Sequence, residues 1–429
     1  MLGGRLRLWK GPAAMSLALF LLGLVAALSA YNVHRPVRRP GEVAVLTFTS
    51  AWLGGELPIH AALLFAGPAL WLALSGGLET WIGGVGLVLV GVAGAAPIAS
   101  WRQATRVATM VERDFGPITE RMSPWRFVLP FVFGDAAVVR TPGIRREGER
   151  LRADLHRPAT ASRSEPAPIL VFVHGGGWVL GFRRWQGRIL MRRLARAGWT
   201  CVSIEYRLSP WATWPDPIID VKRALTWVKR MAPRWGADPN RVVISGNSAG
   251  GHLAALAALT PNEAEFQPGF ETEDTSVAAL VAWYGIYDLI DRARAWPHGA
   301  MRRLWELLVM KQRLRNAPER FERASPLSHV SDTSPPTLLI HGTLDTVVPI
   351  ASARAMWDTF ETVAPGRCRL VEIEGAEHSF EVFWSRRAVC AVEAAVRWLE
   401  VTLESLDSVP AGGDAGRSKD EAIKRPPVV

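Results

Sequence analysis

Residues 241–259 read RVVISGNSAGGHLAALAAL, and this stretch decides the fold prediction. The run RVVIS is short, apolar and typical of a buried strand, whereas HLAALAAL predicts a helix. Between them lies Gly-Asn-Ser-Ala-Gly, whose small residues allow a sharp turn that holds the hydroxyl of Ser248 clear of the sheet. The alternative is a glycine-rich turn with an incidental serine. The strand before the turn and the helix after it favour a nucleophile elbow.

The same alternation of strand and helix patterns continues along the chain around this elbow. Near-continuous apolar strands separated by helices predict an α/β fold, with a mainly parallel sheet that helices cover on both faces. In such sheets the active site lies at the carboxyl ends of the strands. We assign residues 166–404 to this catalytic domain. The predicted strands are 169–173, 201–206, 242–245, 280–284, 337–340 and 369–373, and the predicted helices are 216–229, 249–259, 351–360 and 386–403.

A second glycine-rich motif, His174-Gly175-Gly176-Gly177-Trp178, ends the predicted strand 169–173. Consecutive glycines let backbone N–H groups point at an oxygen that becomes negative during acyl transfer, because no side chain obstructs them. The motif therefore predicts an oxyanion hole, with a flexible turn as the alternative. We also predict that Trp178 binds substrate.

A serine nucleophile needs a base within hydrogen-bonding reach and an acid that orients the base. His378 lies in EGAEHSF, between the last predicted strand and the last predicted helix, where a base can reach the carboxyl edge of the sheet. Asp345 follows another strand, in HGTLDTVVP, and the chain order Ser, Asp, His is the one expected for this fold. Rival acids are Asp288, after a different strand, and Glu377, which as the neighbour of the base would point away. A surface histidine and a loop-capping aspartate are the alternatives to the base and the acid, and we interpret His252 and His341 as structural.

Together the motifs HGGGW, GNSAGG, HGTLDTVVP and EGAEHSF resemble those of the hormone-sensitive-lipase-like carboxylesterases of the α/β-hydrolase superfamily, over residues 168–403. This resemblance implies an ester hydrolase with a triad of Ser248, His378 and Asp345. It also implies that the oxyanion hole is made by the N–H groups of Gly176, Gly177 and Ala249, and that the enzyme uses neither a metal nor an organic cofactor.

Two features depart from the pattern of many members of this family. The acid motif reads Leu-Asp-Thr-Val-Val-Pro where many relatives have Asp-Pro-Leu, which is closer to the feruloyl-esterase-like and prenylcysteine-methylesterase-like branches. The apolar N-terminal region is absent from the soluble esterases. In this respect the chain resembles the membrane-anchored lipase-like esterases of actinobacteria.

Residues 1–100 have the composition of a membrane region. They carry only nine of the 50 basic and 40 acidic side chains of the 429-residue chain. Three stretches, 13–31, 57–76 and 81–100, are each near the ~20 residues that a helix needs to cross the hydrocarbon core, and they predict about three transmembrane helices. The first could instead be a signal peptide, although two further spans after it favour a true helix. The run 43–53 is too short to predict a fourth span.

The flanking charges predict on which side of the membrane the catalytic domain lies. Three basic side chains precede the first predicted span, whereas a larger group lies on the side of the catalytic domain. The bias of Lys and Arg therefore favours a multi-pass protein with a cytoplasmic catalytic domain. The first group is Arg5, Arg7 and Lys10, and the second is Arg35, Arg38, Arg39, Arg102, Arg106 and Arg113.

Composition excludes several other classes of protein. The net charge is +10, but the basic residues are scattered without an aromatic-interleaved stripe, which argues against nucleic acid as a partner. Three cysteines without CxxC spacing exclude a disulfide scaffold and a zinc knuckle. His60 is the only central ionisable candidate in the three apolar segments, so an anchor is favoured over a transporter.

The remaining segments connect or cover the catalytic domain. Residues 101–165 hold a connecting or cap segment and the first strands, including an antiparallel pair at 136–140 and 150–156, and residues 405–429 have the composition of a disordered tail. The apolar segment 125–133 and the insertion 291–331 could build a cap over the acyl site, with ordinary surface loops as the alternative.

The predicted function is hydrolysis of carboxylic esters, either short-to-medium acyl esters or lipid-derived ones, through an acyl-enzyme intermediate. The expected partners are a small-molecule or lipid ester and the lipid bilayer. An acyltransferase or a prenylcysteine-methylesterase-like enzyme would use the same triad. A ligand sensor on this fold would be expected to have lost one of its members.

Overall fold

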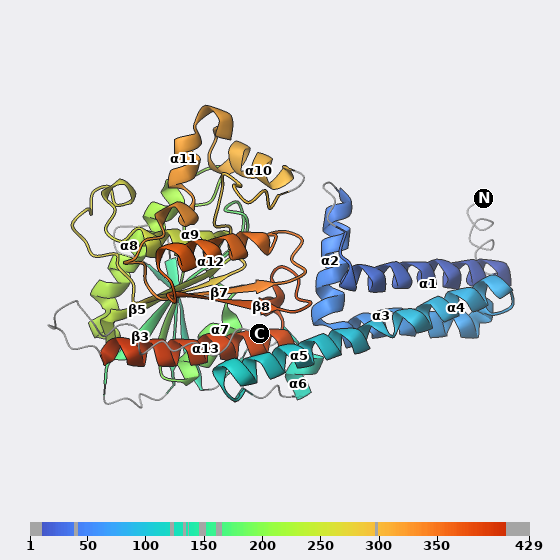
Figure 1. Ribbon diagram of the computed structural model, residues 1–429. Coiled ribbons are helices and arrows are strands. Elements are labelled where there is room, and N and C mark those ends of the chain that lie inside the picture. Colours follow the sequence, from blue (N-terminus) through green and yellow to red (C-terminus); the bar gives the residue numbers. More distant parts are fainter. Residues whose placement is uncertain are drawn as a thin grey trace.

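The protein consists of a sheet flanked by helices and a group of apolar helices that projects from it (Figure 1). The computed structural model describes residues 11–37, 42–120, 124–131, 134–135, 137–145, 152–159, 165–296 and 299–408. The predicted tail from 409 onwards and the basic side chains Arg5, Arg7, Lys10, Arg38 and Arg39 lie outside the described residues.

The sheet has eight strands in the order β1-β2-β4-β3-β5-β6-β7-β8. Strands β3 to β8 pair in parallel, whereas β2 pairs antiparallel with both β1 and β4. This arrangement confirms the predicted α/β fold with a mainly parallel sheet and its antiparallel leading pair. The strands are β1 Val138–Arg145, β2 Arg152–Pro158, β3 Ala167–Val173, β4 Thr200–Ile204, β5 Ala237–Asn247, β6 Ala279–Trp283, β7 Thr337–Gly342 and β8 Cys368–Ile373.

Helices cover both faces of the sheet. One face packs against α8 Asp216–Met231, α9 Ala249–Leu259 and α12 Ala351–Val363, and the other packs against α7 Arg188–Arg196, α13 Arg386–Asp407 and α5 Ala96–Phe115. Every residue of β3 is buried, as expected for a central strand whose two faces both carry apolar side chains. Shorter elements complete this part: α6 Pro124–Val128, η2 Ala232–Trp235, η3 Ala264–Phe266, α10 Ala300–Leu304, η4 Trp305–Val309, η5 Leu314–Asn316, α11 Pro318–Arg323, η6 Pro326–His329 and η7 Phe380–Val382.

Strand register brings the two glycine-rich motifs together at the carboxyl edge of the sheet. Val173 at the end of β3 lies opposite Gly246 in β5, so HGGGW and GNSAG emerge side by side. On the other side of β5, Asn247 lies opposite Trp283 at the end of β6. The sites predicted from separate motifs therefore share one edge.

The projecting group is formed by α1 Pro12–His34, α3 Pro58–Leu72 with η1 Ala73–Gly77, and α4 Trp81–Ala93 (Figure 1). Helices α1 and α4 approach closely because glycines face the contact. A Cβ on Gly86 would lie 2.6 Å from the Cα of Phe20. Small residues of this kind are typical of helix contacts within membranes. Within the described residues, three helical stretches are long and apolar enough to cross a membrane, namely Pro12–His34, Pro58–Gly77 and Trp81–Phe115.

Two elements differ from the simple picture of three spans joined by loops. The run predicted as too short for a span forms α2 Glu42–Glu56, which stands across the ends of α1 and α3, next to the catalytic part (Figure 1).

The third predicted span, expected to end at residue 100, continues into α5, which docks on α13. Arg387 of α13 donates to the Ser100 carbonyl at 3.2 Å and to Gln103 at 3.0 Å. The boundary we expected at residue 100 therefore falls inside a helix that belongs to both parts.

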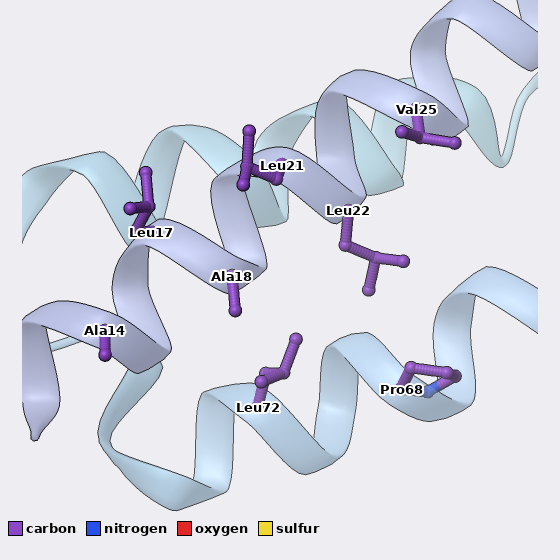
Figure 2. Close-up of a pocket in the computed structure, with 8 residues that line it drawn as sticks. All are labelled: Ala14, Leu17, Ala18, Leu21, Leu22, Val25, Pro68 and Leu72. Carbon is purple, nitrogen blue, oxygen red and sulfur yellow. The ribbon is translucent and has the colours of Figure 1, made fainter. Parts of the chain in front are cut away.

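An apolar cavity of about 550 Å³ lies between α1 and α3. Figure 2 shows Ala18 and Leu22 of α1 facing Leu72 and Pro68 of α3 across it. Pro68 lies inside α3, and membrane helices tolerate such a residue when neighbouring groups satisfy the freed backbone. The cavity is confined to the projecting helices.

Candidate active site

Ser248 lies on the sharp turn between β5 and α9. Its φ and ψ are 54° and −123°, a conformation that is strained for a residue with a side chain, and its N–H donates to the Trp283 carbonyl at 2.9 Å. Small neighbours are required here, because a Cβ on Gly246 would lie 2.8 Å from the Val173 carbonyl oxygen and one on Gly250 would lie 2.6 Å from the carbonyl carbon of His174. This is the geometry expected of a nucleophile elbow.

The structure brings the three predicted triad residues together. His378 Nε2 lies 2.9 Å from Ser248 Oγ, and His378 Nδ1 lies 2.8 Å from Asp345 Oδ2. An ionised carboxylate only accepts hydrogen bonds, so Nδ1 carries the proton and Nε2 accepts from the serine hydroxyl. All three side chains are buried.

Asp345 is held as a carboxylate by its surroundings. Its Oδ1 accepts from the N–H of Val347 at 2.9 Å and of Val348 at 2.7 Å. Burial alone would raise the pKa of Asp345, but the charge and hydrogen bonds of His378 and His341 lower it below its usual range. The carboxylate is therefore ready to orient and stabilise the imidazole at neutral pH.

The pKa of His378 moves the other way. Burial lowers this pKa, but the charge and hydrogen bond of Asp345 raise it more, with further contributions from Glu377 and Glu381, so the net pKa lies above its ordinary value. An imidazole with a raised pKa is a stronger base toward the serine proton.

The rival acids have other partners. Glu377 turns away from the ring, as expected for the neighbour of the base: its Oε1 accepts from the Thr346 N–H at 2.6 Å and from the His378 N–H at 3.0 Å. Burial and the charge of Asp345 raise the pKa of Glu377 to about 7. Asp288 accepts from the Arg292 N–H at 2.6 Å and stabilises a turn after β6.

The predicted oxyanion-hole residues belong to segments that adjoin Ser248: Ala249 follows it in the chain, and a Cβ on Gly175, next to Gly176, would lie 3.0 Å from the Ser248 Cβ. Gly176 and Gly177 have φ of 121° and 61°, which places both in conformations that favour glycine. The N–H of Gly175 donates to Gln186 Oε1 at 2.6 Å and to Asn247 Oδ1 at 3.0 Å, which fixes the start of the loop. Among the hydrogen bonds between described residues, none uses the N–H of Gly176, Gly177 or Ala249. These three donors are therefore available to an oxyanion.

Trp178 differs from our prediction of a substrate-binding residue. Its side chain is 1% exposed and points into the core, where Nε1 donates to His252 Nδ1 at 3.2 Å. His252 in turn lies 2.7 Å from the carbonyl of Ala324 through Nε2. This placement argues against substrate contact by the indole, and it gives His252 the packing role that we expected. His341 is likewise buried, with Nε2 2.8 Å from the Val348 carbonyl.

A second polar cluster next to the base was not recognised in the sequence. The ring of Tyr284 lies against the imidazole of His378, with centroids 4.6 Å apart. Its hydroxyl donates to Glu381, and Asn247 Nδ2 donates to Tyr284 at 2.8 Å and to Glu381 at 2.7 Å. Asn247 within the elbow motif and an acid three residues after the base were the available signals.

No metal-binding arrangement is found in the described part of the chain, in which no group of three or more His, Cys, Asp or Glu side chains is placed to hold an ion. Cys201, Cys368 and Cys390 are buried and free. Burial raises the pKa of the Cys201 thiol well above its usual value. The cysteines are therefore poor nucleophiles, and Ser248 is the nucleophile that the geometry favours.

Known proteins resemble this chain in both sequence and structure. LipM of Mycobacterium tuberculosis, named a probable carboxylic ester hydrolase, is 42% identical over 252 residues, which are 59% of this chain and 58% of LipM. A protein of Oryza sativa subsp. japonica named ICMEL1, a probable isoprenylcysteine alpha-carbonyl methylesterase, is 31% identical over 223 residues, which are 50% of this chain and 51% of that protein. The chain thus matches less than two thirds of the length of either relative.

A solved structure shares the fold over most of its own length. It is the thermophilic esterase Est2 of the Planctomycetes species Thermogutta terrifontis with butyrate bound, which has a TM-score of 0.51 and 25% sequence identity. The likeness covers 65% of this chain and 97% of that one.

The family model BD-FAE matches residues 153–360, from β2 into α12. This range includes the glycine-rich loop, the elbow and the loop of Asp345. Together with the relatives, the match confirms the resemblance that the sequence motifs indicated. Over its catalytic part the chain is therefore similar to known ester hydrolases, and its motifs resemble those of the hormone-sensitive-lipase-like carboxylesterases of the α/β-hydrolase superfamily.

Proposed function

We propose that this protein is a membrane-anchored serine carboxylesterase that hydrolyses esters through an acyl-enzyme intermediate. The observation that carries the proposal is the chain of contacts from Ser248 Oγ through His378 to Asp345, at 2.9 Å and 2.8 Å. These contacts lie beside three backbone donors that are free to bind an oxyanion. The names of LipM and Est2, a carboxylic ester hydrolase and an esterase, support the same reaction.

The reaction follows from these positions. Ser248 Oγ attacks the ester carbonyl carbon while His378 Nε2 takes its proton, and the N–H groups of Gly176, Gly177 and Ala249 stabilise the negative oxygen. The carbon–oxygen bond to the alcohol then breaks, and the alcohol leaves with the proton from His378. Water attacks the acyl-enzyme with His378 again as the base, which releases the acid and restores the serine.

The substrate that we propose is a short-to-medium acyl ester or a lipid-derived ester. Est2 binds butyrate, and the rice relative is named for a methylesterase of isoprenylcysteine, a lipid-modified residue. Apolar side chains are exposed near the projecting helices, including Trp125, Val128, Leu129 and Phe131 of the predicted cap segment. His60 of α3 contacts the Val128 carbonyl at 3.1 Å, which places this segment beside the second candidate span. An ester could therefore reach the site from the bilayer.

A chain-length series tests the activity. The full chain in detergent should hydrolyse p-nitrophenyl esters somewhere between acetate and palmitate, with higher rates on micellar than on monomeric esters. Equal rates on the two forms would contradict delivery from a lipid phase, and no hydrolysis by folded protein would contradict the esterase. Added alcohols distinguish an acyltransferase, because new esters would then form in place of the free acid.

We also propose that the three candidate spans anchor the catalytic domain on the cytoplasmic side. Three spans place the N-terminus and the catalytic domain on opposite sides, and the larger group of flanking basic residues lies with the catalytic domain. In intact spheroplasts an added protease should leave the catalytic domain uncut, and it should cut after permeabilisation. Cleavage of the domain in intact spheroplasts would reverse the assigned orientation.

A further inference from the structure

The helix α2 contacts the loop that carries the base. This helix belongs to the N-terminal region in sequence, yet it stands between the projecting helices and the carboxyl ends of β7 and β8 (Figure 1). Trp52 Nε1 donates to the carbonyl of Ser379 at 3.0 Å, and Ser379 follows His378 directly. A side chain 326 residues before the base is thus one hydrogen bond away from its backbone.

Further contacts extend along the same loop. The ring of Trp52 packs on Phe383 with centroids 4.5 Å apart. At the end of α2, Glu56 accepts from the hydroxyl of Ser385 at 2.5 Å and lies 3.6 Å from Arg387, while the same arginine donates to the Gly55 carbonyl at 2.8 Å. Glu56 and Arg387 are both buried. The segment from residue 379 to residue 387 is therefore attached to α2 at both ends.

The loop depends on such contacts because it lacks a regular ladder of backbone hydrogen bonds. It runs from the end of β8 to the start of α13 with only one short helical turn, η7. Ser379 has a φ of 61°, in the left-handed region that favours glycine. The Ser379 carbonyl accepts from the Val382 N–H at 3.2 Å within the loop and from the Trp52 indole, so Trp52 is the contact that ties this strained residue to an element outside the loop.

We propose that Trp52 is a positioning residue for the general base, so that α2 is part of the catalytic unit. By holding the Ser379 carbonyl, the indole sets the backbone of His378 and with it the distance from Nε2 to Ser248. This inference rests on the proposed function, in which His378 is the base. Misplacement of a catalytic group by about 1 Å costs on the order of 10²-fold in rate, so a looser loop should lower kcat more than it affects binding.

The variant Trp52→Phe keeps an aromatic ring against Phe383 and removes the hydrogen-bond donor. We expect kcat for p-nitrophenyl butyrate to fall by about 5- to 10-fold, which corresponds to the loss of one ordinary hydrogen bond, with little change in KM. The acid limb of the pH profile should move to lower pH, because a base held less firmly against Asp345 has a lower pKa. The matched control Trp71→Phe, on an exposed tryptophan of α3, should leave kcat and the profile unchanged.

Amide hydrogen exchange of residues 379–385, in the full chain in lipid nanodiscs, provides a readout that does not need activity. Exchange should be faster in Trp52→Phe than in the wild type, and unchanged in Trp71→Phe. If wild type hydrolyses no ester, the proposed function fails, and the exchange result alone decides whether Trp52 holds the loop. Wild-type kcat and exchange in a folded Trp52→Phe variant would overturn the inference. Should Trp52→Phe not fold, Trp52→His, which keeps a ring and an N–H donor, is expected to retain near-wild-type values, and a fall in its kcat would also overturn it.

Discussion

Replacing Ser248 with alanine should lower kcat for p-nitrophenyl butyrate by on the order of 10⁶-fold, the loss seen when a serine hydrolase loses its nucleophile. No other group can replace this hydroxyl, because Ser248 Oγ is the oxygen that the turn presents to His378 Nε2, at 2.9 Å. Folding should be little affected, since alanine has the same Cβ as serine at a φ of 54°. The measurement is hydrolysis by detergent-solubilised protein, with thermal melting as the check on folding.

A remote hydroxyl gives the matched control for this substitution. Ser405, near the end of α13, donates only to the Thr402 carbonyl at 2.8 Å among its hydrogen bonds in the described structure. Ser405→Ala should therefore keep wild-type kcat. A fluorophosphonate probe should label wild type and Ser405→Ala but not Ser248→Ala. Labelling or substantial hydrolysis that survives in Ser248→Ala would place the nucleophile elsewhere.

The second large effect is expected for Asp345→Asn, which should lower kcat by about 10⁴-fold. An asparagine at this position can still bond to Nδ1, but its NH₂ group can stabilise the wrong tautomer of His378, with the proton on the nitrogen that must accept from serine. Glu377→Gln is the control, because this side chain bonds to the Thr346 N–H and not to the ring. It should cost less than about tenfold, and a larger loss for Glu377→Gln than for Asp345→Asn would reverse the assignment of the acid.

The pH profile gives an independent check on the same pair. Neutral His378 is the active form, so kcat/KM should rise with pH as the imidazole loses its proton. The charge of Asp345 raises the pKa of His378, so the midpoint should lie above the ordinary value of about 6.5. In Asp345→Asn the carboxylate charge is gone, and the midpoint should move to lower pH. An unchanged midpoint would show that the group that titrates is not His378.

The sheet and the positions of the triad could be predicted because the sequence patterns that indicate them are short and local. Ser248 is flanked by the small residues that its turn requires, and Asp345 and His378 each follow an apolar run that forms a strand. Parallel strands bring their carboxyl ends to one edge, so three distant loops could be placed together before any contact was known. Asp345 was preferred to Asp288 because Asp288 follows a different strand, and to Glu377 because the immediate neighbour of the base would point away from it.

Other features of the site depend on contacts that leave no local pattern. From the sequence, a tryptophan after a glycine-rich loop could equally be a substrate contact or a core residue. The packing of Trp178 against His252 shows that it lies in the core. Trp52 lies in an apolar run, and the sequence does not reveal its hydrogen-bond partner. The partner is a backbone carbonyl, which a residue of any type provides. The continuation of the third candidate span into α5 also escaped prediction, because the change from exposed apolar residues to residues packed on α13 occurs within one helix.

That continuation has a consequence for how the enzyme meets its substrate. The 20 residues of α5 rise by about 30 Å and are fastened to α13, so in the membrane-anchored enzyme that we propose no flexible linker separates the third candidate span from the catalytic domain. The enzyme would diffuse laterally in the membrane, and its active site would stay at a constant distance from the membrane surface. For an ester dissolved in that leaflet, the search is two-dimensional. Turnover should then follow the mole fraction of ester in the membrane and not its concentration in the bulk solution.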